Sequence, residues 1–198
     1  MIKCILFDLG GVIVDYTDKE YYRYLSSISN INAFKIEKMI TPIKSKLEEG
    51  MLTESNFNSL LAKMLKIPIK KVQWSSFYKS HSKINKKVLR LATMLKEKYD
   101  IGFLSNVDIA RHIITKHRIN YGIFKYRFCS CYMKMSKPNP EIFKKVLAKM
   151  KLKPWEIIFI DDRKDNVESA NSIGINVIQF TNYVKLKRML KRRFQLPM

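Results

Sequence analysis

The chain contains little cysteine, little glycine and few acidic residues. Among its 198 residues there are three Cys, six Gly and six Pro. Three cysteines in a chain of this length do not form the disulfide framework of a small secreted domain, so we expect buried, reduced thiols. Cys129 and Cys131 are two residues apart and would face the same side of a strand. The chain also contains no internal repeat and no low-complexity linker.

Long hydrophobic runs are also missing. No run reaches the roughly 18 apolar residues that a membrane-spanning helix needs. The apolar stretch at the N-terminus is interrupted by Asp8 and contains no small-residue cleavage site, which argues against a signal peptide. From these observations we expect a cytoplasmic protein with no membrane contact.

Acidic residues are outnumbered by basic ones. The chain has 38 Lys and Arg against 17 Asp and Glu, a formal net charge of +21. Such a charge attracts phosphate-bearing partners and permits nucleic-acid contact. However, the basic residues are spread along the whole chain, and no aromatic-rich RNA-binding signature accompanies them. The one dense run, residues 185–193, has apolar residues at helical spacing and predicts a terminal amphipathic helix with a basic outer face.

Strand and helix patterns alternate over most of the chain, whose apolar fraction of 46% suits one domain with a modest insertion. Buried strands are predicted at residues 2–7, 101–104, 126–131, 157–160 and 175–178. Helices are predicted around residues 88–95 and 109–116, after Asn139 and Pro140, over residues 165–173, and at the C-terminus. This alternation predicts an α/β fold: a Rossmann-like parallel sheet with helices on both faces.

Residues 17–84 have a different pattern, with helical spacing and no convincing buried strand. A second helix in this region is expected to be interrupted or kinked at Pro42, Thr53 is expected to cap a third, and Pro68 to open a fourth. We therefore predict a core formed by residues 1–16 and 85–198, and a small all-helical module at residues 17–84.

Polar side chains stand where the predicted strands end, or in the loops between them. They are Asp8, Ser105, Asn106, Lys137, Asp161 and Asp162. Functional groups of a parallel sheet lie beyond the carboxyl ends of its strands, so we expect these residues to gather at one edge. Carboxylates, a hydroxyl and an ammonium at that edge suit a Mg²⁺ ion beside a phosphoryl group.

Each of these residues also has a simpler interpretation. Asp8 is able to ligate a metal and attack phosphorus, or to stabilise a turn. Ser105 is able to hold phosphate oxygens or to cap a helix. The adjacent acids Asp161 and Asp162 repel each other unless a cation or nearby lysines relieve them. Asp165 and Asn166 begin the next predicted helix, and they would cap it or support the metal ligands from behind.

Four segments follow one another in a fixed order that resembles the motifs of the haloacid dehalogenase-like hydrolase superfamily. They are FDLGG, FLSN, SKP and IDDRKDN. The first motif and the segment EEGMLTESNF are most similar to small sugar-phosphate phosphatases with a helical cap. The resemblance implies a phosphatase in which Asp8 is the nucleophile of a phosphoaspartyl intermediate. It further implies Lys137 as catalytic, Ser105 and Lys137 on phosphate, and Asp8, the Gly10 carbonyl and Asp162 on Mg²⁺, with Asp161 beside them. From their positions next to these residues, we also expect Asn106 on phosphate and Asn166, with Asp161, behind the metal ligands.

The chain departs from this family at Gly10. Most phosphatases of the superfamily carry there a second Asp, the general acid for the leaving oxygen. Its loss disfavours poor leaving groups, so we expect a small phosphorylated metabolite with a more acidic leaving group, such as a sugar 1-phosphate. Asp15 and His81 are the alternative proton donors.

Two other functions stay open. One is dehalogenation of a 2-haloacid, which needs no Mg²⁺. The other is a non-catalytic, basic nucleic-acid-binding module. Surface or packing roles are favoured over contacts with substrate for the remaining candidates. These are the histidines His112 and His117 and the aromatic residues Trp74, Phe77 and Tyr78.

Overall fold

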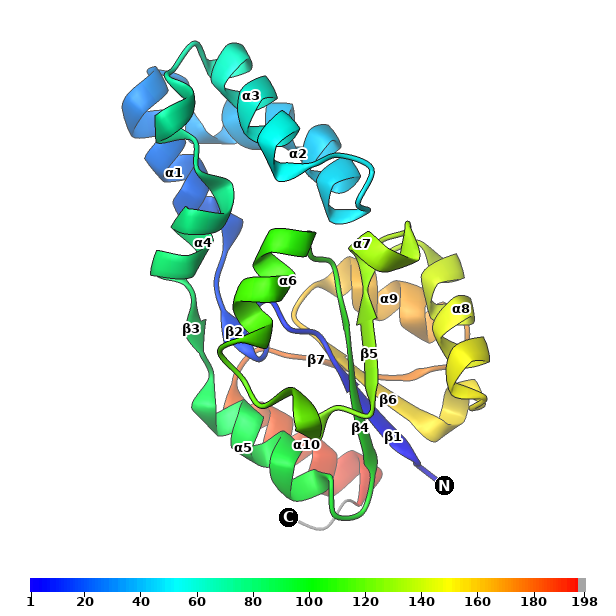
Figure 1. Cartoon of the computed structure of the whole chain (residues 1–198). Helices are drawn as coiled ribbons and strands as arrows, with labels where there is room; N and C mark the ends of the chain where they lie inside the picture. Colours follow the sequence, from blue (N-terminus) through cyan, green and yellow to red (C-terminus); the bar gives the residue numbers. More distant parts are fainter. Residues whose placement is uncertain (196–198) are drawn as a thin grey trace.

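The core of the molecule is a five-stranded parallel sheet (Figure 1), seen in a computed structural model that describes residues 1–195. Residues 196–198, the end of the predicted core segment, lie outside the described residues. The strand order is β5-β4-β1-β6-β7 and every pairing is parallel, which confirms the predicted α/β fold. The strands are β1 (Cys4–Phe7), β4 (Asp100–Ser105), β5 (Tyr126–Cys129), β6 (Ile157–Asp161) and β7 (Asn176–Gln179).

Successive side chains of β1 pack into different apolar clusters. Ile5 and Phe7 belong to the cluster on one face of the sheet, and Cys4 and Leu6 to the cluster on the other. Because both faces are covered, the strand is apolar at every position rather than at every second one. The register aligns Phe7 with its neighbours in β4 and β6, so the residues after these strands emerge side by side.

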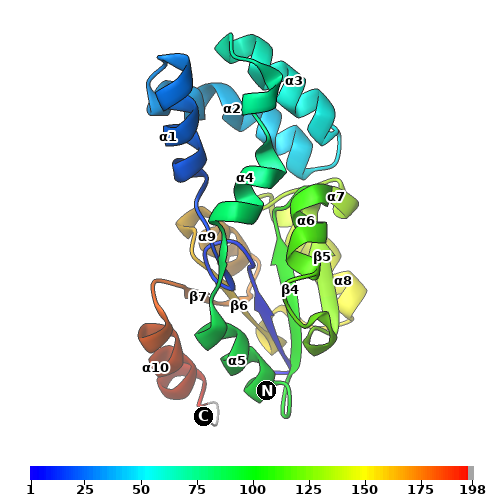
Figure 2. The same cartoon turned by 60° about the vertical axis from the view of Figure 1, so that its left-hand side comes forward.

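Helices cover both faces of the sheet, as Figures 1 and 2 show from two directions. Buried residues of α5 and α10 join the cluster on one face, and those of α8 and α9 the cluster on the other. The helices are α5 (Lys86–Leu95), α6 (Ile109–Lys116), α7 (Ser130–Met133), α8 (Pro140–Met150), α9 (Lys164–Ser172) and α10 (Tyr183–Phe194), with single 3-10 turns η2 (Tyr121–Ile123) and η3 (Pro154–Glu156).

A helical cap stands beyond the carboxyl end of the sheet, at the top of Figures 1 and 2. It contains α1 (Asp18–Ser29), α2 (Ala33–Glu48), α3 (Glu54–Leu65), the 3-10 turn η1 (Ile69–Lys71) and α4 (Trp74–His81). The cap has its own apolar cluster, and the chain enters and leaves it through the antiparallel pair β2 (Val14–Asp15) and β3 (Lys83–Ile84). The division of the chain at residues 17 and 84 stays a prediction.

Three local expectations were wrong. The interruption expected at Pro42 does not occur: helix α2 runs through this residue, with cap packing around both halves, and the alternative of a kink stays a prediction. Pro68 precedes only the turn η1, and α4 begins later, at Trp74. The strand predicted at residues 126–131 ends at Cys129, where the chain turns into α7.

Cys129 and Cys131 therefore do not share a strand face, although all three cysteines are free and buried as expected. The capping roles of Thr53 and Asn139 are confirmed: their side chains accept hydrogen bonds from Asn56 and Glu141 N–H. The strand β3 within residues 17–84 was not expected.

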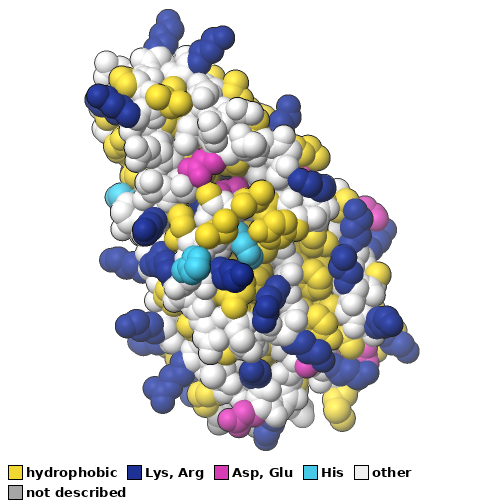
Figure 3. All heavy atoms as spheres, viewed as in Figure 1, with side chains coloured by type: hydrophobic (Ala, Val, Ile, Leu, Met, Phe, Trp, Pro, Cys, Tyr) yellow, Lys and Arg dark blue, Asp and Glu magenta, His cyan; other side chains and the backbone are white. Residues whose placement is uncertain are grey.

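The C-terminal run forms the predicted amphipathic helix. Leu186 and Leu190 of α10 are buried, while lysines and arginines occupy its exposed positions. Figure 3 shows lysine and arginine spread over the whole visible face, from the cap to the foot of the core. No helix in residues 1–195 has both the length and the apolar character to cross a membrane.

Candidate active site

Lys137 lies at the centre of the polar edge predicted from the sequence. Its side chain is fully buried, and its ammonium lies 3.0 Å from Asp8 Oδ2 and 2.6 Å from Asp161 Oδ2. It also donates a 2.9 Å hydrogen bond to the Leu104 carbonyl at the end of β4. Three neighbouring strands therefore each supply one partner of a single cation.

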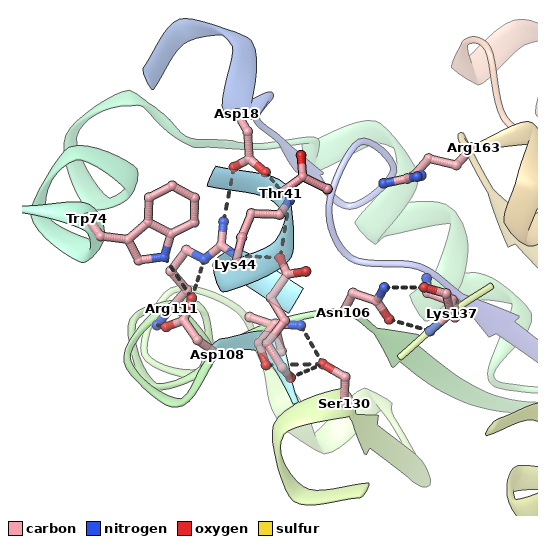
Figure 4. Close-up of polar contacts among 12 residues, drawn as sticks. Asp18, Thr41, Lys44, Trp74, Asn106, Asp108, Arg111, Ser130, Lys137 and Arg163 are labelled. Atoms are coloured by element: carbon pink, nitrogen blue, oxygen red, sulfur yellow. Dashed lines mark hydrogen bonds and ion pairs between the residues drawn. The ribbon is translucent and has the colours of Figure 1, made fainter. Parts of the chain in front are cut away.

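Asn106 holds the main chain of Lys137 in place. The Asn106 amide donates to the Lys137 carbonyl at 2.7 Å and accepts from the Lys137 N–H at 2.9 Å, a reciprocal pair visible in Figure 4. Burial alone would lower the pKa of Lys137, but Asp161 and Asp8 outweigh it and raise this pKa above its usual value. The ammonium is therefore a permanent charge of the site.

Asp161 is fully committed to neighbours within the protein. Besides Lys137, it accepts hydrogen bonds from the Arg163 N–H at 2.9 Å and from the Asn166 amide at 3.0 Å to each carboxylate oxygen. Asn166 is itself buried, and its carbonyl oxygen Oδ1 has no hydrogen-bond partner within residues 1–195. An acceptor left over beside the carboxylates suits a water molecule of a hydrated cation.

Three carboxylates face one another at this edge. Ligand oxygens of Asp8, Asp161 and Asp162 all lie within 4.8 Å of one another. Burial raises the pKa of Asp8 to about 8; Lys137 opposes this rise, and Asp161 adds to it. Burial and Asp161 likewise raise the pKa of Asp162. Three acids against one ammonium leave negative charge uncompensated, and oxygen donors of this kind fit Mg²⁺.

The two glycines after Asp8 differ in what surrounds them. Gly11 has φ +71°, and a Cβ there would lie 2.4 Å from the Asp162 carboxylate, so this position needs glycine. Gly10 is exposed, has no positive φ, and a Cβ there would meet no described atom within 4 Å. The structure thus leaves open space at the position where related phosphatases carry an acid.

Other predicted residues lie around this edge or away from it. Ser105 is buried at the end of β4, in register with Cys129 of β5. Asp165 forms an exposed ion pair with Arg163 at 2.7 Å. The hydrogen bond from Arg163 is the largest cause of the lowered pKa of Asp165. Asp15 is exposed on β2.

The histidines make contacts that serve packing. His81 stacks on Phe77 with ring centroids 3.7 Å apart, and its Nδ1 lies 2.9 Å from the Phe77 carbonyl oxygen. His112 Nδ1 lies 3.0 Å from Cys129 Sγ, and burial lowers the pKa of His112. Neither ring contacts a carboxylate of the site among the contacts of the described chain.

Trp74 and Tyr78 join the cap to the core. Trp74 is fully buried and its indole N–H donates to Asp108 Oδ2 at 2.9 Å. The Tyr78 hydroxyl lies 2.7 Å from Thr115 Oγ1 in α6. These contacts agree with the packing role that the sequence favoured for both residues.

Sequence reasoning missed a group of buried and half-buried charges between cap and core, which we call the cap–core ion cluster. Its members are Asp18, Lys44, Glu48, Asp108 and Arg111. One signal was present: Arg111 lies four residues before Thr115, and both occupy the buried face of α6. A charged residue on the buried face of a short helix indicates a partner elsewhere in the fold.

Comparisons with known proteins agree with this geometry. A family model described as "haloacid dehalogenase-like hydrolase" matches residues 2–174. A HAD family enzyme of Bacteroides thetaiotaomicron, solved with magnesium and inorganic phosphate, superimposes with a TM-score of 0.79 at 26% identity, over 94% of this chain and 99% of that one.

Two curated relatives are also similar in sequence. D-ribitol-5-phosphate phosphatase of Bacteroides thetaiotaomicron is 26% identical over 92% of this chain and 93% of its own length. Flavin mononucleotide hydrolase 1 of Arabidopsis thaliana is 32% identical over 50% of this chain, and the match spans only 41% of that protein. Because the family model matches most of its length, the chain belongs to the haloacid dehalogenase-like hydrolases.

Proposed function

We propose that the protein is a Mg²⁺-dependent phosphatase that hydrolyses a small phosphomonoester through a phosphoaspartyl intermediate on Asp8. One observation carries the proposal: Asp8, Asp161 and Asp162 converge within 4.8 Å, with the Lys137 ammonium 3.0 Å from Asp8. The relative solved with magnesium and phosphate supports the choice of both metal and substrate group.

Asp8 is the proposed nucleophile. One of its oxygens attacks phosphorus, the bond from phosphorus to the leaving oxygen breaks, and that oxygen takes up a proton. Water then cleaves the acyl phosphate, releasing inorganic phosphate and restoring the carboxylate. Lys137 lowers the energy of the negative charge that builds up on the phosphoryl oxygens, because its ammonium is already fixed and dehydrated.

Asp8, Asp162 and the Gly10 carbonyl are the proposed Mg²⁺ ligands. Bound there, Mg²⁺ would neutralise the carboxylates and the phosphoryl oxygens. Asp161 and Asn166 are proposed to stand behind these ligands, in keeping with the hydrogen bonds between them. Ser105 and Asn106 are proposed to hold phosphate oxygens; one amide N–H of Asn106 is already used on Lys137.

The substrate is proposed to be a small phosphorylated sugar or polyol. The similarity to D-ribitol-5-phosphate phosphatase supports a polyol phosphate. Gly10 supports a substrate whose leaving group needs little protonation, such as a sugar 1-phosphate, because no acid stands at this position. A panel that pairs 1-phosphates with 5-phosphates of the same sugars separates the two expectations.

Turnover of p-nitrophenyl phosphate tests the proposal. We expect phosphate release with Mg²⁺, none with EDTA, and a loss of at least about 10³-fold in Asp8→Asn, since the amide is no nucleophile. Asp100→Asn is the matched control: it breaks an exposed pair with Lys125 at the amino end of β4, the end of the strand opposite to Ser105, and its rate should equal that of the wild type. Metal-independent turnover, or full activity in Asp8→Asn, would reject the mechanism.

A further inference from the structure

Arg111 is the central member of the cap–core ion cluster. Its guanidinium contacts three carboxylates: Asp108 Oδ2 at 2.6 Å, Glu48 Oε1 at 2.8 Å and Asp18 Oδ1 at 3.2 Å. Figure 4 shows it between Asp18 on one side and Asp108 on the other. The side chain is only 6% exposed, so its pairs with Asp108 and Glu48 are buried, and its pair with Asp18 is half-buried.

The three carboxylates belong to different parts of the molecule, two to the cap and one to the core. Asp18 begins α1 and Glu48 ends α2, both in the cap, whereas Asp108 and Arg111 belong to the core. Arg111 therefore holds two cap helices at once, through the planar fork that only arginine provides. Its guanidinium also lies 4.4 Å from the centre of the Trp74 ring.

Apart from the buried Trp74 and from Tyr78, which packs in an apolar cluster of the core, the joint between cap and core rests mainly on polar contacts. The apolar cluster of the cap is separate from those of the core, and the chain crosses between them only through β2 and β3, two residues each. A cavity of about 210 Å³ opens beside the cluster, between residues 47–54 of the cap and the start of α6. Polar joints between compact units permit relative motion, whereas large apolar ones do not.

The same joint reaches the active site. The Ser130 hydroxyl donates to the Glu48 carbonyl oxygen, and Ser136, the residue before Lys137, donates to the Glu49 carboxylate at 2.6 Å. The end of α2 that Arg111 holds is thus bonded to the segment that carries Lys137. Displacing this end would expose the site edge to water.

We propose that Arg111 is a positioning residue that keeps the cap closed over Asp8 through its ion pairs with Asp18 and Glu48. This role rests on the proposed phosphatase function. A substrate that binds the closed form gains apparent affinity in proportion to the closed fraction, so weakening the pairs raises KM while the rate of the bound complex is preserved.

The charges of the cluster allow it to be weakened without unfolding the protein. Three carboxylates face two cations, Lys44 and Arg111, so neutralising one acid leaves two charges of each sign. Burial would raise the pKa of Asp18, but Lys44 and Arg111 outweigh it and hold this pKa below its usual value. Asp18 is therefore ionised at neutral pH, and Asp18→Asn removes a real charge while keeping its shape.

The experiment compares Asp18→Asn, Glu48→Gln and Arg111→Lys with the wild type. Asp100→Asn is the matched control, since it breaks an exposed pair with Lys125 at the amino end of β4, whereas the cap stands beyond the carboxyl end of the sheet. Amide hydrogen exchange is followed in peptides covering residues 45–54 and 107–116. We expect exchange there to accelerate at least about fivefold in each cluster variant, with KM raised about three- to tenfold and kcat changed less than twofold.

Two results would overturn the inference. One is exchange and KM equal to those of the control in Asp18→Asn and Glu48→Gln. The other is exchange that accelerates equally in the strands of the core, which would make the cluster a general stabiliser. Hydrogen exchange needs no turnover, so it decides the role of Arg111 even if no phosphomonoester is hydrolysed and the proposed function itself fails.

Discussion

Replacing Gly10 with aspartate should turn this chain into a faster phosphatase toward poor leaving groups. The position lies two residues after the proposed nucleophile, is exposed, and has no positive φ that would penalise a side chain. A Cβ placed there would meet no described atom within 4 Å. We therefore expect Gly10→Asp to fold as the wild type does.

The size of the gain follows from the chemistry. General acid catalysis typically contributes about 10²–10⁴-fold, or roughly 3–5 kcal/mol of barrier at 1.36 kcal/mol per tenfold. The gain should be near this range for an alkyl ester such as ribitol 5-phosphate, whose alkoxide must be protonated as it leaves. It should be below about tenfold for p-nitrophenyl phosphate, whose phenolate leaves without a proton.

The assay is kcat/KM for both esters in Gly10→Asp, with Gly10→Asn as the control of equal shape and no acidic proton. Gly10→Asn should match the wild type on both substrates. Equal acceleration of the alkyl and aryl esters, or no acceleration of the alkyl ester, would refute the reasoning. The second outcome would mean that another group already delivers the proton.

Three further predictions concern neighbouring residues. Because burial raises the pKa of Asp8 to about 8, the metal-free folded state holds a proton that the unfolded state loses near pH 4. Stability should therefore fall from pH 5 to 8, and Mg²⁺ should raise Tm more at pH 8. Asp8→Asn should weaken both trends in scanning fluorimetry, and Asp162, whose pKa is also raised, should supply the remainder. Gly11→Ala should abolish activity and weaken Mg²⁺ binding in calorimetry, because its Cβ would lie 2.4 Å from the Asp162 carboxylate. Trp74→Phe should cost about 1–3 kcal/mol in urea unfolding, because it removes the 2.9 Å hydrogen bond to the buried Asp108; an unchanged midpoint would contradict this.

The sheet and its polar edge were predictable from the sequence because both follow from patterns of neighbouring residues. A buried strand followed by a polar residue is a local pattern, and a parallel sheet brings the carboxyl ends of its strands to one edge. Asp8, Asp161 and Asp162 therefore converge as expected. Their individual roles stay proposals, since proximity does not by itself assign chemistry.

Other features depend on contacts that no local pattern records. The run YRFCSCYM mixes apolar and polar residues alike on both sides of Cys129, so the sequence does not mark where β5 ends and α7 begins. Pro42 was expected to interrupt α2, yet packing of the cap on both sides of the proline keeps the helix whole. In both cases tertiary packing decided the outcome over intrinsic propensity.

Two lysines held among carboxylates, the buried Lys137 and the half-buried Lys44, differ in how much of their role the sequence indicated. Lys137 and Lys44 each contact two carboxylates, with shortest distances of 2.6 and 2.5 Å. Around Lys44 a second cation, Arg111, brings the charges close to balance. Around Lys137 three acids face one ammonium, and the pKa values of Asp8 and Asp162 rise in response. A cluster of acids short of two positive charges is a place for a divalent cation, whereas a nearly balanced one joins two parts of the fold. The resemblance had already singled out Lys137 among the 38 basic residues, but only the fold places Lys44 between cap and core.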